Sequence, residues 1–438
     1  MPAAPFSADK YIRLVDSVDF VRQNGKVRQV IGVVLESLGP NMAVGETCQI
    51  WYKRTAEPVL AEVVGFRDNK VLIMPLGDLA GIGAGSEVVS LGKPLQIGVT
   101  DDLLGRVLDG LGHPMDGKGR IIADHRAAVT ASPPDPLSRR RITSPLSMGI
   151  RAIDGMLTCG KGQRVGIFAG SGVGKSTILG MIARNASSDV NVIALVGERG
   201  KEVRDFIERD LGEEGLKKSV VVVSTSDQPA LVRIKAAFVA TTIAEYFRDQ
   251  GLDVMFMMDS VTRFAMAQRE VGLAIGEPTT TRGYTPSVFA LLPKLLERAG
   301  TSKNGTITGL YAVLVDGDDL NEPVADAVRS ILDGHVVLSR QLAAANHYPA
   351  IDVLGSVSRV MPDVVDQNHL SAASAIRDIL ATYREAEDLI NIGAYVPGSN
   401  PRVDLALSKI ENIRSFLRQG IEERATFDET MLRLMGVA

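Results

Sequence analysis

A glycine-rich loop between a β-type run and a helical run constrains this chain more than any other feature. The apolar run Arg164–Phe168 is followed by the loop Ala169–Thr177 and then by the helical pattern Ile178–Asn185. Glycines followed by Lys, Ser and Thr at this spacing are typical of a loop that binds phosphate groups. Because a buried strand must end and a helix must begin here, the loop predicts an α/β core.

The loop residues have distinct predicted tasks. The glycines let backbone N–H groups surround phosphates at the start of a helix. Lys175 would reach the β- and γ-phosphates of ATP, and Ser176 would ligate Mg²⁺. Ala169 stands where the pattern usually has its first glycine, but the glycines nearest the phosphates are present. The predicted nucleotide-binding residues of the loop are Gly170, Ser171, Gly172, Val173, Gly174, Lys175, Ser176 and Thr177.

The region around the loop alternates apolar β-type runs with longer helical patterns. Near-continuous apolar runs are typical of parallel strands that helices cover on both faces. The predicted strands of this core are Arg164–Phe168, Asn191–Val196, Ser219–Ser224, Asp253–Met258 and Thr308–Val315. Residues 105–144, rich in Gly and Pro, are expected to be a connection into the core.

The 438 residues predict about three domains. Residues 1–22 contain an apolar stripe that predicts a helix, either packed on its own domain or bound to a partner. Residues 23–98 carry short β-type runs, the first being Val30–Glu36, which predict a small β-barrel. Residues 99–365 form the core, and residues 366–438 form a small α-helical domain. Its predicted helices are Leu370–Leu389, Val403–Leu417 and Ile421–Met435.

Composition excludes several function classes. Lys and Arg number 48 against 52 Asp and Glu, so the basic excess that nucleic-acid binding needs is missing. The two cysteines, Cys48 and Cys159, lie far apart and cannot form a disulfide framework or a thiol zinc site. No leader-like segment and no apolar stretch of ~18 residues is present, which favours a cytoplasmic protein. The basic triplet Arg139–Arg141 is expected to be a solvated linker.

Two carboxylates follow predicted strands, at the edge where α/β sheets bind ligands. Asp259 follows the run Asp253–Met258 and could hold the Mg²⁺ shell, or could simply cap the next helix. Glu198 follows the run Asn191–Val196 through Gly197 and could polarise an attacking water as a general base. It could equally be an ordinary surface glutamate in a charged run.

Further motifs resemble the F-type and V-type rotary ATPase α/β subunit family. The motifs that carry this resemblance are Pro349–Ser358, Gly197–Gly200 and Met258–Ala265. Within the family the chain is most similar to the export ATPases of flagellar and type III secretion, and the flagellar version is resembled especially in Ser144–Asp154, Pro278–Phe289 and Val315–His335. The similarity covers essentially the whole chain and implies a nucleotide-binding core of the RecA type.

The resemblance implies roles for individual residues. Lys175 and Ser176 would bind phosphate and Mg²⁺, while Asp259 would support the metal. Glu198 would be the catalytic base, and Arg199 beside it would assist the transition state. ATP and Mg²⁺ are therefore the expected cofactors, and the five His suggest no other metal site.

Two further roles concern the edges of the site. Arg359 matches the arginine finger that a neighbouring subunit inserts, so the resemblance implies a homohexameric ring. Tyr348 matches the aromatic residue that stacks on adenine. The segment Phe416–Ile421 offers Gly and Ile where the catalytic subunit of the synthase has Pro and Phe, and Glu277 stands where that subunit carries Arg. Both differences favour the export branch.

The expected partners follow from the same resemblance. They are a regulatory stator-like protein at the N-terminal helix, chaperone–substrate complexes and export gate proteins, with the protein in the cytoplasm or peripheral at the inner face of the cell membrane. One alternative is the catalytic subunit of a rotary proton or sodium ATPase, although the segment Ile392–Gly398 is neutral where that subunit is acidic. A non-hydrolysing scaffold subunit would lack Glu198. A hexameric RNA translocase would need an oligonucleotide site richer in aromatic and basic residues than Trp51 and Tyr52 provide.

Overall fold

The computed structural model describes residues 24–438 except 53–56, 124, 316 and 318. The helix predicted within residues 1–22 lies outside the described residues. The chain divides into two compact units between Leu95 and Gln96. No helix in the described ranges combines the length and the apolar character that crossing a bilayer requires.

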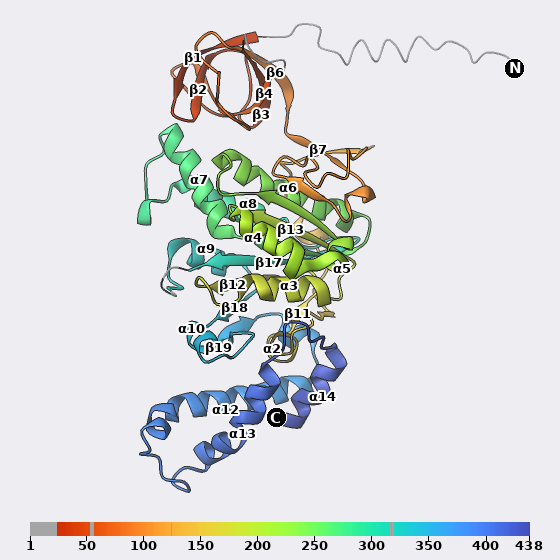
Figure 1. Cartoon of the computed structure of the whole chain (residues 1–438), viewed down its shortest axis with the longest axis vertical. Helices are drawn as coiled ribbons and strands as arrows, with labels where there is room; N and C mark the ends of the chain where they lie inside the picture. The colour runs from red at the N-terminus through yellow and green to blue at the C-terminus, as the bar shows by residue number, and fades with distance from the viewer. Residues whose placement is uncertain (1–23, 53–56, 124, 316, 318) are drawn as a thin grey trace, which may run out of the picture. The chain divides into compact units, whose positions relative to one another are not determined.

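The first unit is a closed six-stranded barrel with strand order β1-β2-β5-β4-β3-β6 (Figure 1). Buried side chains such as Leu35, Ile50 and Ile73 fill its interior. The predicted barrel is confirmed, but its first run, Val30–Glu36, is a hairpin and not one strand, because Gly32 turns the chain with φ 57°. The strands are β1 (Asn24–Ile31), β2 (Val34–Leu38), β3 (Glu46–Trp51), β4 (Val59–Arg67), β5 (Lys70–Pro75) and β6 (Glu87–Pro94).

A nine-stranded sheet forms the centre of the second unit, with order β19-β18-β12-β17-β15-β13-β14-β8 and β16 paired to β17. The five predicted core strands are all present and parallel. The structure adds β18 in parallel, β19 and β16 in antiparallel, and β8 from the predicted connection. The bounds are β8 (Val107–Asp109), β12 (Arg164–Ala169), β13 (Val190–Val196), β14 (Ser219–Ser224), β15 (Asp253–Asp259), β16 (Gly300–Thr301), β17 (Thr306–Leu314), β18 (Gly334–Leu338) and β19 (Ile351–Ser358).

The added strands lack the continuous apolar run that marks a buried parallel strand. Edge strand β19 alternates buried and partly exposed residues, and β8 has only three residues. Two small ribbons flank the sheet, β7 (Gln96–Val99) with β9 (His125–Ala128) and β10 (Pro145–Leu146) with β11 (Cys159–Gly160). Cys159 is buried as expected.

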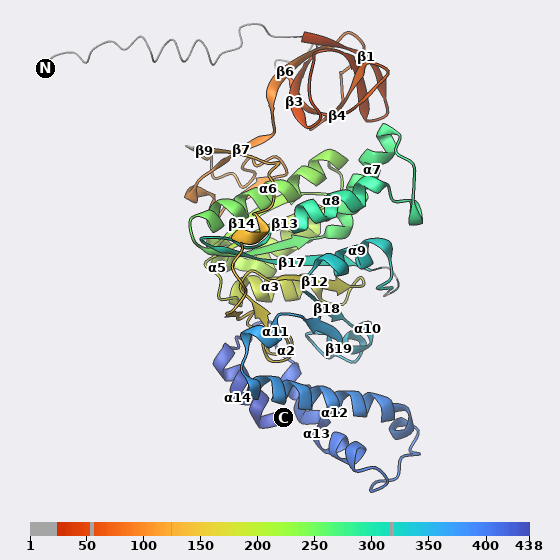
Figure 2. The same cartoon turned by 180° about the vertical axis from the view of Figure 1, so that it is seen from behind.

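Helices cover both faces of the sheet (Figures 1 and 2). Ile178 and Ile182 of α3 pack with Ile193 and Leu195 of β13 in one buried cluster, while α6 and α7 lie on the other face. Their bounds are α2 (Arg151–Met156), α3 (Lys175–Asn185), α4 (Gly200–Asp205), the π-helix η3 (Phe206–Leu211), α5 (Gly212–Lys217), α6 (Ala230–Asp249), α7 (Val261–Ile275), α8 (Pro286–Leu296), α9 (Pro323–Ile331), α10 (Arg340–Ala344) and α11 (Met361–Val364). The 3-10 helices are η1 (Asp101–Leu103), η2 (Pro136–Ser138) and η4 (Thr281–Gly283).

The C-terminal region is helical, as predicted, and consists of α12 (Gln367–Asn391), α13 (Pro401–Leu417) and α14 (Phe427–Val437). The last helix begins six residues later than the predicted Ile421, because Thr426 is its N-cap and forms a capping box with Glu429. Ile413, Phe416 and Leu434 belong to the same buried cluster as the core residues, so the helices and the core share one hydrophobic interior.

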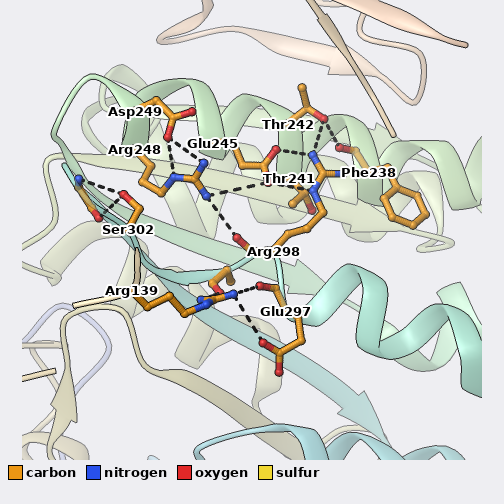
Figure 3. Close-up of polar contacts among 12 residues, drawn as sticks. Arg139, Phe238, Thr241, Thr242, Glu245, Arg248, Asp249, Glu297, Arg298 and Ser302 are labelled. Atoms are coloured by element: carbon orange, nitrogen blue, oxygen red, sulfur yellow. Dashed lines mark hydrogen bonds and ion pairs between the residues drawn. The ribbon is translucent and has the colours of Figure 1, made fainter. Parts of the chain in front are cut away.

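Two residues of the triplet Arg139–Arg141 are bonded to the core, which corrects the expectation of a merely solvated linker. Arg139 donates to the carbonyls of Glu297 and Ala299, and Arg140 donates to that of Ser302 at 3.0 Å. Nearby, Arg298 is fully buried and pairs with Glu245 of α6 (Figure 3). Arg139 and Arg140 therefore attach the connecting segment to the core.

Candidate active site

The glycine loop connects the end of β12 to the start of α3. Gly172 and Gly174 have φ angles of 79° and 91°, a region that residues with a side chain rarely adopt. Val173 between them is buried and anchors the loop. Gly174 is the N-cap of α3 and contributes no side-chain hydrogen bond, so the first N–H groups of the helix are available to an anion.

Three charged side chains from different elements meet beside this loop. Lys175 begins α3, and its Nζ contacts Asp259 Oδ1 and lies 3.9 Å from Glu198 Oε1. Asp259 ends β15, and Glu198 follows β13 through Gly197. Because β13 and β15 are adjacent and parallel, their carboxyl ends meet at the same edge. Each of the three side chains is at most 12% exposed.

The N-cap of α7 is Ser260 and not Asp259. The Ser260 hydroxyl accepts a hydrogen bond from the N–H of Arg263 at 3.3 Å. The alternative role of Asp259 as a helix cap is therefore wrong, and its carboxylate points to Lys175 instead.

Glu198 is not an ordinary surface glutamate, since only 8% of the residue is exposed. Burial, which is the largest cause, and the negative charge of Asp259 together raise its pKa to about 7, although the positive charge of Lys175 opposes part of the rise. A hydrogen bond with Glu202 also favours the protonated form of Glu198. The carboxyl group is thus close to half ionised near neutral pH, which suits a general base.

Several buried polar atoms at this edge have no hydrogen-bond partner within the described protein. They are Glu198 Oε1, Ser224 Oγ and Arg263 Nε. Buried polar groups in folded proteins are nearly always paired, so this edge fits a polar ligand. Ser224 ends β14 beside β13, and its carbonyl accepts from Gly197 N at 2.7 Å.

Arg263 is the residue of the site to which the sequence analysis assigned no role. It lies in the first turn of α7, and a Cβ added to Gly197 would come within 2.9 Å of its Cβ. Its positive charge acts on Glu198 and lowers the pKa of that carboxyl group, against the larger effect of burial. Arg263 lies one helical turn after Asp259, which follows a predicted strand, and this position in the sequence could have indicated that it belongs to the site.

Comparisons with known proteins agree with this architecture. Residues 27–92 match the beta-barrel domain and residues 149–358 the nucleotide-binding domain of the ATP synthase alpha/beta family, and residues 365–436 match the T3SS EscN ATPase C-terminal domain. The flagellum-specific ATP synthase of Bacillus subtilis is 54% identical over 97% of both chains. The chain belongs to the ATP synthase alpha/beta family.

Solved structures place the chain in the export branch of the ATP synthase alpha/beta family. The assembled ATPase EscN of the enteropathogenic E. coli type III secretion system superposes with a TM-score of 0.90 at 48% identity, covering 94% of this chain and 99% of that one. EscN in complex with its central stalk EscO gives a TM-score of 0.87 at 47% identity, with the same coverage. The family resemblance drawn from the sequence motifs, including a RecA-like core, is confirmed.

The family resemblance gives a catalytic role to Arg199 in this chain's own site and to Arg359 in the site of a neighbouring subunit. Arg199 follows Glu198, but its side chain is 76% exposed and pairs with Glu202 at 3.7 Å. Arg359 is exposed, and its N–H donates to the Asp333 carbonyl at 3.1 Å. Asp333 in turn pairs with Arg164 at the beginning of β12, whereas the glycine loop follows the end of β12.

Tyr348 lies beside the glycine loop. A Cβ added to Gly174 would be 3.7 Å from its ring, and the residue is 42% exposed. Its carbonyl accepts from Gln419 N at 2.9 Å, which ties it to the C-terminal helices. Phe416 is buried against Gly155 and cannot form a second aromatic wall.

Proposed function

We propose that this chain is a Mg²⁺-dependent ATPase that energises protein export through a flagellar or type III secretion apparatus. The observation that carries the proposal is the meeting of Lys175, Glu198 and Asp259 beside a glycine loop. This constellation occurs here in a family whose relatives are named for flagella and type III secretion. A buried glutamate with a pKa near 7 argues against a non-hydrolysing scaffold.

The proposed reaction is hydrolysis of the γ-phosphoryl group. The backbone N–H groups of the loop and Lys175 bind the phosphates and hold them in line for attack. Ionised Glu198 accepts a proton from water, whose oxygen forms a bond to the γ-phosphorus while the bond to the β-phosphate oxygen breaks. Arg263 is close enough to Glu198 to help balance negative charge at this edge.

The metal in this proposal is held partly by the nucleotide. No group of three or more His, Cys, Asp or Glu side chains that could hold an ion occurs in the described ranges. Mg²⁺ at ATP sites typically takes one or two protein ligands together with phosphates and water. The Ser176 hydroxyl and the Asp259 carboxylate are the groups proposed to hold it, and it would neutralise phosphate charge. Tyr348 would offer its exposed ring to the adenine.

Arg359 is proposed to act as a finger in the site of a neighbouring subunit. Its N–H is bonded to the carbonyl of Asp333, whose carboxylate pairs with Arg164 at the start of β12. The five residue-to-residue steps from Arg164 to Ala169, where the loop begins, span about 17 Å at ~3.3 Å per residue. This distance favours a role in trans, and a homohexamer in which each interface joins one loop to one finger. The assembled state of EscN supports a ring.

The proposed setting follows the relatives. A central stalk like the one that EscO provides for EscN is a proposed partner, together with a regulatory protein at residues 1–22, chaperone–substrate complexes and export gate proteins. The proposed location is the cytoplasm or the inner face of the cell membrane. Co-purification from the native cell would distinguish flagellar from injector components, and recovery of rotary synthase subunits instead would refute the export assignment.

Subunit mixing tests the reaction and the ring together. Arg359→Ala should keep its affinity for ATP and lose turnover by about 10³-fold or more. Lys175→Ala should lose turnover through weakened phosphate binding. Rings assembled from both variants should regain phosphate release, because some interfaces pair an intact loop with an intact finger.

Two controls make the mixing test decisive. Ring formation and subunit exchange are measured separately, and wild-type activity should rise more steeply than linearly with protein concentration as rings form. Wild-type turnover by Arg359→Ala alone, or no recovery in rings shown to contain both variants, would refute a finger acting in trans.

A further inference from the structure

The turn that carries Arg359 is held by main-chain and side-chain bonds on both sides of it. Arg359 N donates to the Asp333 carbonyl at 3.1 Å. The preceding Ser358 hydroxyl donates to the Thr158 carbonyl at 2.8 Å and accepts from Met361 N at 3.2 Å. Because the Arg359 side chain itself is exposed, the direction in which it projects depends on this turn.

Gln163 joins these bonds from the interior of the core. It is fully buried, and its amide Nε2 donates to the Asp333 carbonyl at 3.1 Å and to the Ser358 hydroxyl at 3.2 Å. Its Oε1 accepts from Gly160 N at 2.9 Å. Both amide hydrogens and the carbonyl oxygen are therefore in use. One donated bond therefore goes to the Asp333 carbonyl, which also accepts from Arg359 N. The other goes to Ser358, the residue before Arg359.

The Gln163 amide packs against Gly334, where there is no room for a side chain. Gly334 pairs with Ser358 across β18 and β19. A Cβ at Gly334 would lie 3.2 Å from Gln163 Nε2 and 2.6 Å from the Val357 carbonyl. A side chain at this position would disturb either the amide or the strand that leads to Arg359.

Asp333 extends the same set of bonds to the first strand of the nucleotide-binding motif. Its carboxylate accepts from the N–H and the Nε of Arg164, both at 3.0 Å. Gln163 thus immediately precedes β12 and Arg164 begins it, while the glycine loop follows the other end of this short strand. The single strand β12 therefore connects the residues that hold the Arg359 turn with the proposed phosphate site.

We infer that Gln163 is a positioning residue for Arg359, acting through Ser358 and the Asp333 carbonyl on the site of the neighbouring subunit. The inference rests on the proposed role of Arg359. A misplacement of about 1 Å at a reacting centre can cost about 100-fold in rate. Gln163→Met, which keeps the volume and removes all three hydrogen bonds, should therefore lower kcat by about 10- to 100-fold, with KM for ATP within about threefold because its own loop is intact.

The decisive measurement is ATP hydrolysis by full-length rings mixed from two variants, which shows which pairs of variants restore each other's activity. Gln163→Met should recover ATP hydrolysis when co-assembled with Lys175→Ala, because the Lys175→Ala subunit keeps Arg359 and the residues that position it. It should not recover when co-assembled with Arg359→Ala, because both variants then lack a working finger. A defect of folding or of the local pocket would not produce this pattern.

Two further variants keep the test sound. Ser358→Ala removes one of the two bonds that Gln163 donates, together with the Ser358 bonds to Thr158 and Met361. It should recover with Lys175→Ala and not with Arg359→Ala, so the inference remains testable if Gln163→Met does not fold. Thr308→Val is the matched control. The buried Thr308 hydroxyl accepts from the N–H of Gly162, the neighbour of Gln163, at 2.8 Å and takes no part in the hydrogen bonds that hold the Arg359 turn. Thr308→Val should hydrolyse ATP within about threefold of wild type.

Wild-type kcat in both Gln163→Met and Ser358→Ala would overturn the inference. So would failure of either to recover with Lys175→Ala in rings where Arg359→Ala does recover, or recovery of Gln163→Met with Arg359→Ala. Failure of Arg359→Ala itself to recover with Lys175→Ala would instead refute the proposed finger, so the two failures are distinguishable.

Discussion

The pKa of Glu198 predicts how hydrolysis depends on pH. Burial is the largest cause of its rise to about 7, and the charge of Asp259 is the second. Only the ionised carboxylate can accept a proton, so activity should increase as pH rises through this value. The expected direction is opposite to that of a general acid, which must be protonated to act.

The size of the effect follows from the titration. With a pKa about 7, about a tenth of Glu198 is ionised at pH 6 and about nine tenths at pH 8. kcat/KM for ATP, which reports the free enzyme, should then increase about tenfold between these pH values. With the usual pKa of 4.5, the carboxylate would be almost fully ionised throughout and the profile would be nearly flat.

The assay is phosphate release at low ATP concentration and saturating Mg²⁺ between pH 5.5 and 8.5. Asp259→Asn removes one cause of the raised pKa of Glu198 and should move the midpoint of the profile to lower pH while lowering the rate. Because the titration of ATP itself affects both proteins equally, it does not contribute to the difference between their midpoints. Glu198→Gln should bind ATP but hydrolyse it about 10²- to 10⁴-fold more slowly. A flat wild-type profile, or a midpoint unchanged in Asp259→Asn, would refute the reasoning.

Other expectations follow from single contacts. Arg298→Ala removes the main partner of the buried Glu245 carboxylate, which keeps an ion pair with Arg248 at 3.9 Å, and should lower the free energy of unfolding by about 3–5 kcal/mol. The double variant Arg298→Met, Glu245→Leu should regain much of this loss, and equal denaturation midpoints for Arg298→Ala and wild type would contradict the expectation. Tyr348→Ala should weaken ATP binding by about 1–3 kcal/mol and Tyr348→Phe should not, because the ring face makes the contact; isothermal titration measures both, and equal losses would exclude stacking. Lys175→Ala should bind ATP more weakly in the same experiment, and an unchanged affinity would remove Lys175 from the phosphate site.

The sequence alone predicted those parts of the molecule that contiguous residues encode. The glycine loop requires only a strand, positive φ at a few glycines and a helix start, all within residues 164–185. The buried strands were equally accessible, because a parallel strand covered on both faces is apolar at nearly every position. Asp259 and Glu198 could be placed together because each follows such a strand, and the ends of parallel strands share an edge.

Only the tertiary structure decided what depends on strand order and burial. β15 and β17 lie between β12 and β13 although they come later in the chain, which sets the charges that surround Glu198 and raises its pKa. Edge strand β19 has a polar, interrupted sequence that hid it, so the bonds between Gln163, Asp333 and the turn at Arg359 could not be foreseen. These contacts join residues up to 195 positions apart, and no local pattern records them because hydrogen-bond partners are chosen by packing.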